Sequence, residues 1–127
     1  MRDAALAYLN DGMNCAQCLI KAADDEYGLR LGERCYGLCS MLSNGFGVGL
    51  FCGVPLAGLM LLGLTLSPET AKRARLLLLS GFFERFGSFD CAVLTRCGGC
   101  DAIITETSDL IKTLIDDGSR RDENGRN

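Results

Sequence analysis

The apolar residues of this chain recur with helical spacing, and almost no segment alternates apolar and polar residues as a strand would. Between residues 71 and 86, and again between 103 and 115, apolar side chains fall every three or four positions and so gather on one side of a helix. Glycines separate these segments. The pattern predicts an all-α fold, a bundle of five or six helices with a glycine-rich loop at residues 44–53.

Short polar and glycine signals indicate where several helices begin and end. Asn14 followed three residues later by Gln17 matches a capping box, and Gly28 is placed to close the same helix. The run Ser67–Glu69 combines a capping serine, a proline and an acid, which together mark another helix start. The expected helices cover residues 2–9, 14–27, 33–42, 55–64, 68–86 and 101–115, with a short turn at 88–94.

The end of the chain differs in composition from the rest. Residues 117–127 are polar and charged and offer no apolar anchor, so we expect a disordered tail there. A chain of 127 residues fits one hydrophobic core. We therefore expect residues 1–116 to form a single helical, cysteine-rich domain.

One stretch carries no charge at all. No charged residue lies between Arg34 and Glu69, and residues 46–66 are almost continuously apolar, long enough by count to span a bilayer. However, this stretch contains five glycines and Pro55, and basic residues flank both of its ends. A helix buried inside the bundle explains the same hydrophobicity, so we do not expect this protein to associate with a membrane.

The charge balance limits the classes of binding partner that the chain can have. The formal net charge is −3, and no basic block is dense enough to follow a phosphate backbone, so we expect no nucleic acid. The first residues show no secretory signal, which favours a cytoplasmic protein. Because the leucine-rich surface needs cover, a homodimer is plausible.

Cysteine is the residue type in this sequence that most clearly indicates a functional site. The chain holds eight cysteines and no histidine. In a reducing compartment thiols serve metals or catalysis more often than structural disulfides. The absence of histidine excludes histidine-ligated haem, mixed Cys/His zinc sites and Cys–His nucleophilic pairs within this chain. The available ligand atoms are therefore sulfur.

Four of these cysteines fall near expected helix starts: Cys15, Cys52, Cys91 and Cys100. Unpaired N–H groups at a helix N-terminus stabilise a thiolate, so we expect lowered pKa values at these positions. Glycine admits a close approach of backbone to a ligand, and Gly47, Gly49 and Gly53 are expected to line the bound group. For the additional Cys18, Cys35, Cys39 and Cys97 the sequence leaves three alternatives open: they enlarge this site, form a second site or bind nothing.

The sequence resembles the C_GCAxxG_C_C family of redox-active proteins. The resemblance rests on four separated blocks and extends from about Ala7 to Ile111: Gly12–Gln17, Gly45–Gly49 leading to Cys52–Met60 and Gly63–Leu64, Phe86–Ser88 with Cys91, and Cys100. Val54 and Ala57 depart from the residues usual there. By position, the signature cysteines of the family correspond to Cys15, Cys52, Cys91 and Cys100.

The resemblance implies a class of function. Members occur mostly in anaerobic bacteria and are presumed to bind a metal or cluster through these cysteines, and a similar helical domain in split-Soret cytochromes is associated with an iron–sulfur site. We therefore expect an iron–sulfur cluster protein that acts as an electron carrier or redox accessory protein with an unidentified redox partner. The alternatives are a zinc-binding structural module, or thiol–disulfide exchange through the pairs Cys15/Cys18 or Cys97/Cys100.

Overall fold

A computed structural model describes residues 1–96 and 99–125. The described residues form helices and no strand, which confirms the all-α prediction. The elements in chain order are α1 (Arg2–Asn10), α2 (Cys15–Tyr27), α3 (Gly32–Leu38), the short π-type turn η1 (Gly45–Gly49), α4 (Gly53–Thr65), α5 (Pro68–Phe86), α6 (Cys91–Leu94) and α7 (Asp101–Gly125).

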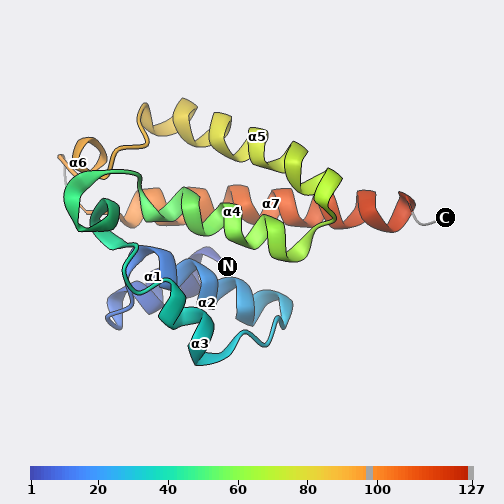
Figure 1. The fold of residues 1–127 in the computed structure, drawn as a ribbon, viewed down its shortest axis with the longest axis horizontal. Coiled ribbons are helices and arrows are strands. Elements are labelled where there is room, and N and C mark those ends of the chain that lie inside the picture. Colours follow the sequence, from blue (N-terminus) through green and yellow to red (C-terminus); the bar gives the residue numbers. More distant parts are fainter. Residues whose placement is uncertain (97–98, 126–127) are drawn as a thin grey trace.

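The long helix α7 is the centre of the bundle. It packs against α1, α4 and α5, while α4 also contacts α2 on one side and α5 on the other. Figure 1 shows α5 on one side of the α4 and α7 pair and α1, α2 and α3 on the other. In the same view, α6 and the first turns of α4 and α7 lie at one end of the bundle.

The core forms where three helices approach closely. Leu78 of α5, Ile111 of α7 and Gly58 of α4 meet there, and both large side chains are fully buried. A methyl group added at Gly58 would lie 2.8 Å from Leu78 Cδ2 and 3.0 Å from Ile111 Cδ1. Glycine at this position therefore lets α4 pack directly on its neighbours.

The local start and stop signals are confirmed. The Asn14 side chain accepts hydrogen bonds from the backbone N–H groups of Ala16 and Gln17, and the Gln17 side chain accepts one from Asn14 N–H, which completes the capping box. Gly28 and Gly87 close α2 and α5 in the left-handed conformation. These signals act within a few residues, so they are readable from sequence.

Several boundaries differ from the expectation, and the short turn expected at 88–94 is helical only from Cys91 to Leu94. The third helix ends at Leu38, four residues before the expected end at Leu42. Helix α4 begins at Gly53, ahead of Pro55, because a proline is tolerated anywhere in the first helical turn, where its missing N–H has no intrahelical partner.

The C-terminal end of α7 differs more strongly from the expected helix end at residue 115. The helix continues through residues expected to be a disordered tail, as far as Gly125. Asp122 explains this, since its carboxylate accepts hydrogen bonds from Ser67 N–H at 2.9 Å, Ser67 Oγ at 2.7 Å and Thr70 Oγ1 at 2.6 Å. The last turns of α7 are thus joined to the N-terminus of α5.

Within the described ranges, no helix has both the length and the apolar character that a membrane crossing requires. The charge-free stretch instead contains the buried helix α4, in which Val54, Ala57, Leu61 and Leu62 are almost completely covered.

Candidate metal centre

Four cysteines from four separate segments line one cavity of about 290 Å³: Cys15, Cys52, Cys91 and Cys100. The rest of its wall is formed by Leu9, Asn14, Ser43, Asn44, Leu94, Thr95 and Ile103. These are the cysteines that the helix starts and the family resemblance both indicate. The fold brings them around a common space although they are spread over more than eighty residues of sequence.

Each of the four cysteines stands at a helix start. Cys15 and Cys91 are the first residues of α2 and α6, and Cys52 is the residue that caps α4. Cys100 immediately precedes α7, and its carbonyl accepts the hydrogen bond from Ile104 N–H at 2.9 Å. The cavity thus lies among the starts of four helices.

A short antiparallel bridge joins the segments that carry Cys52 and Cys91. Cys52 N–H donates to the Phe89 carbonyl at 2.7 Å, and Cys91 N–H donates to the Leu50 carbonyl at 2.6 Å. Between these bonds the rings of Phe51 and Phe89 stack with centroids 5.3 Å apart. The backbone of both cysteines is thus fixed by the same bridge.

Asn14 fixes the backbone of the neighbouring Cys15. Its Oδ1 caps α2, while its Nδ2 donates to the carbonyls of Cys39 at 3.0 Å and Ser40 at 3.2 Å. One side chain therefore joins the start of α2 to the chain that follows α3. No sequence pattern indicates the second half of this connection, because its partners lie 25 and 26 residues away.

The loop before α4 adopts an unusual backbone. Asn44 and Phe46 both have positive φ angles, of 55° and 65°, which non-glycine residues rarely adopt. Gly45 is required between them, since a methyl group there would lie 2.3 Å from the backbone nitrogen of Leu50. In this conformation the backbone N–H of Asn44 hydrogen-bonds the Cys15 thiol.

The three glycines expected around the bound group have different surroundings. Gly53 packs against Cys15, so that a methyl group added at Gly53 would lie 3.1 Å from the Cys15 sulfur. Gly49 instead faces α6, where an added methyl group would lie 3.0 Å from Ala92 Cβ. Gly47 has no neighbour within 4 Å of such a methyl group. Of these glycines, Gly53 is the one in contact with a cavity cysteine.

At Cys15, Cys52 and Cys100 the expected lowering of the thiol pKa is not found. Burial raises the pKa of Cys52 to about 12, against a smaller opposing effect of the hydrogen bond from Val54 N–H. Burial, followed by the neighbouring Cys100 and Cys91 thiols, also raises the pKa of Cys15. Burial and the nearby Cys91 thiol raise the pKa of Cys100. At these three cysteines desolvation of the charged form thus outweighs the effect of the helix ends, and a bound cation would favour their thiolates.

The cavity is not shaped around a single ion. Within residues 1–96 and 99–125, no group of three or more cysteine, aspartate or glutamate side chains is arranged to hold a metal ion. The cavity of about 290 Å³ that the four thiols line is also lined by seven other residues.

The other cysteines lie outside this wall. Cys18 is fully buried behind Cys15, and its thiol donates to the Cys15 carbonyl at 3.3 Å. Cys35 and Cys39 line a different groove. Cys97, and with it the pair Cys97/Cys100, falls outside the described residues. The seven described cysteines are all free thiols.

The chain matches the model of a known protein family. The model of a family described as "Putative redox-active protein (C_GCAxxG_C_C)" matches residues 13–114, which include all four cavity cysteines. The comparison with curated proteins gives no match, and neither does the comparison with solved structures.

Proposed function

Since this chain belongs to the C_GCAxxG_C_C redox-active family, we propose that it holds an iron–sulfur cluster through Cys15, Cys52, Cys91 and Cys100. Its role is that of an electron carrier or redox accessory protein. The observation that carries the proposal is the common cavity: four thiols, each at a helix start, converge from distant parts of the sequence on one space. Cysteine thiolates are the usual ligands of such clusters.

The shape of the cavity supports a group of several atoms over one zinc ion. A structural zinc site places four sulfurs about 2.3 Å from one ion, which leaves no open space between them. Here the four thiols line a cavity of about 290 Å³, and among the described residues no three cysteine, aspartate or glutamate side chains are arranged as ligands of a single ion. A polynuclear centre fits this arrangement better, because its ligands attach at separated metal atoms.

The residues around the cavity suit such a group. When bound, an iron–sulfur cluster supplies one-electron transfer. The backbone N–H groups of Asn44 and Val54 are already directed at the sulfurs of Cys15 and Cys52, where they stabilise negative charge. Leu9, Leu94 and Ile103 supply the hydrocarbon part of the cavity wall. Hydrogen bonding to sulfur and solvent exclusion are two of the factors by which proteins set the reduction potential.

The proposal is tested by anaerobic purification and cluster reconstitution of the full chain. We expect iron and acid-labile sulfide together, with a visible thiolate-to-iron absorption that bleaches on reduction. Cys52→Ser and Cys91→Ser should lose iron, sulfide and absorption, while Cys35→Ser, which alters a thiol outside the cavity, should keep all three.

Two outcomes would contradict the proposal. One is zinc near stoichiometry with no reducible chromophore, which would identify a structural zinc module. The other is a colourless, iron-free protein after reconstitution, although circular dichroism shows the same helix content as before. Helical folding of each variant is checked in the same way, so that loss of the cluster is not confused with unfolding.

A further inference from the structure

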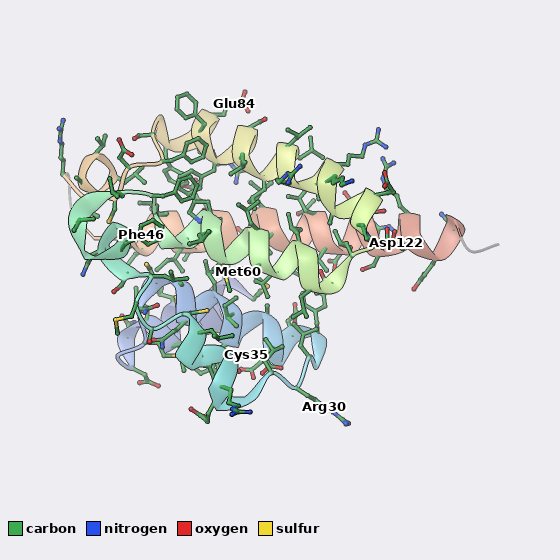
Figure 2. All side chains as sticks on the ribbon, in the orientation of Figure 1. Arg30, Cys35, Phe46, Met60, Glu84 and Asp122 are labelled. Carbon is green, nitrogen blue, oxygen red and sulfur yellow. The ribbon has the colours of Figure 1, made fainter. Side chains whose placement is uncertain are left out.

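A second sulfur-lined site lies away from the four-cysteine cavity. A groove of about 190 Å³ between α2, α3 and α4 is lined by Cys35 and Cys39 and by the thioether of Met60. In Figure 2, Cys35 is labelled on α3 and Met60 on α4. None of these three residues lines the cavity described above, so their chemistry is not used by the proposed cluster.

Both thiols lie near the C-terminal end of α3. Cys35 is in the last turn of α3 and Cys39 is the residue that immediately follows the helix, and both line the same groove. They are close enough for the charge of one to raise the pKa of the other, since Cys35 contributes, after burial, to the raised pKa of Cys39. The pair therefore forms a dithiol, with both residues free.

The third sulfur comes from the facing helix. Met60 is 40% exposed, Cys35 is partly exposed and Cys39 is fully buried, so the three sulfur side chains run from the surface into the groove. The remaining wall is hydrocarbon, from Ile20, Leu31, Leu38, Leu61 and Leu64. The groove thus offers sulfur donors without a carboxylate or an amide side chain in its wall.

This donor set selects the ligand. Calcium and magnesium require oxygen ligands, which the groove wall does not supply from side chains. A structural zinc site requires four strong ligands, and two thiols with a thioether fall short of this. Soft thiolate and thioether sulfur suits monovalent copper. We propose that Cys35, Cys39 and Met60 form a binding site for one Cu(I) ion.

The binding step involves no change of oxidation state. Cu(I) forms bonds to the sulfurs of Cys35 and Cys39 as each thiol releases its proton to solvent, and the neutral thioether of Met60 adds a third sulfur bond. The complex then carries one net negative charge, from two thiolates and one monovalent cation. Electrons are neither gained nor lost, so the ion must be supplied as Cu(I) under reducing conditions.

The test measures Cu(I) binding by the reduced, metal-free full chain against a coloured Cu(I) chelator under anaerobic conditions. Thiols of the four-cysteine cavity can also take up Cu(I), so the quantity compared is the number of ions per chain. We expect Cys35→Ser to bind one ion fewer than the native chain. Cys18→Ala is the matched control, because it removes a thiol outside both sites and should leave the number unchanged.

Met60 is tested by Met60→Leu, which keeps the size and apolar character of the side chain. The number of bound ions should stay the same, while the affinity for Cu(I) at this site should fall by at least about tenfold. Loss of a residue that only hydrogen-bonds a metal ligand already lowers metal affinity by that much. X-ray absorption at the copper edge should show fewer sulfur neighbours. An unchanged affinity and unchanged spectrum would exclude Met60 as a ligand.

A measurement on the unaltered chain keeps the test independent of any variant's folding. Bound Cu(I) should protect Cys35 from alkylation, with the modified position read by mass spectrometry. Equal numbers of bound ions in the native chain and Cys35→Ser would overturn the proposal. Alkylation of Cys35 at the same rate with and without Cu(I) would overturn it as well.

Discussion

Gly53, the first residue of α4, packs directly against the sulfur of Cys15 at the start of α2. A methyl group on Gly53 would lie 3.1 Å from Cys15 Sγ and 2.8 Å from the carbonyl oxygen of Leu42. The sulfur cannot move away freely, because Asn14 and Gln17 hold the first turn of α2 through the capping box. The absence of a side chain at residue 53 is therefore part of what positions a cavity thiol.

Gly53→Ala should disturb the four-cysteine cavity. The added methyl group must displace Cys15 or the Leu42 backbone, and overpacking of this kind costs about 1–3 kcal/mol of unfolding free energy. We expect a lower midpoint in chemical denaturation and weaker incorporation of iron and sulfide on reconstitution.

Gly63→Ala is the matched control on the same helix. A methyl group there meets nothing within 4 Å, and alanine is favoured over glycine in a helix by roughly 0.5–1 kcal/mol. We expect this variant to be slightly more stable and to incorporate iron as the native chain does. Equal iron content in the two variants would show that contact with Gly53 does not position Cys15.

Asn14→Ala tests the connection between the start of α2 and the chain after α3. The substitution removes the cap of α2 and the two hydrogen bonds to the carbonyls of Cys39 and Ser40. Loss of a helix cap costs typically about 1 kcal/mol, and each further hydrogen bond about 0.5–1.5 kcal/mol. We expect the unfolding free energy to fall by about 2–4 kcal/mol in denaturant titrations.

The control for Asn14 is Asn10→Ala, at the exposed end of α1. It changes the same side chain in a place where little is buried, and stability should shift by no more than about 0.5 kcal/mol. Similar losses in both variants would mean that the buried connections of Asn14 contribute little.

Local signals explain why much of the fold can be predicted from the sequence. The caps at Asn14 and Ser67 and the left-handed glycines Gly28 and Gly87 each act on a neighbouring helix turn, and all four have the expected role. The same reasoning places Cys15, Cys52, Cys91 and Cys100 at helix starts. Their convergence on one cavity follows from the bundle packing, which the spacing of the cysteines does not reveal.

What could not be predicted depends on contacts between distant residues. The bridge between Phe51 and Asp90 joins segments almost forty residues apart, and neither segment has a strand pattern. The raised thiol pKa values reflect burial, which depends on the assembled core and outweighs the helix-end effect that the sequence suggested. The groove that holds Cys35, Cys39 and Met60 likewise needs three packed elements.

Thiol reactivity should distinguish the cysteines in the metal-free protein. Burial raises the pKa of Cys52 to about 12, so its reactive thiolate is scarce at neutral pH and increases about tenfold with each pH unit until that pKa is reached. Cys35 is partly exposed. We expect iodoacetamide at about pH 7.5 to modify Cys35 before Cys52, as followed by mass spectrometry.

The pH dependence provides the internal control for this experiment. Between about pH 7 and 9 the alkylation rate of Cys52 should continue to rise steeply, without the plateau that a thiol of ordinary pKa near 8.5 would approach. Cys18, whose pKa burial also raises to about 12, should follow the same course. A plateau for Cys52 below about pH 9 would show that the helix end, rather than burial, dominates its ionisation.

Asp122→Ala should release the last turns of α7. The carboxylate accepts hydrogen bonds from Ser67 and Thr70 at the start of α5, so its removal leaves residues 119–125 without this connection. We expect faster amide hydrogen exchange in residues 119–125 and a loss of about 1–2 kcal/mol, since hydrogen bonds to charged groups contribute about 1.5–3 kcal/mol when well shielded. Glu123→Ala, at the exposed neighbouring position, should leave exchange unchanged. If amide hydrogen exchange in residues 119–125 is equally fast in both variants, helix α7 continues past Asp117 for a reason other than its contact with α5.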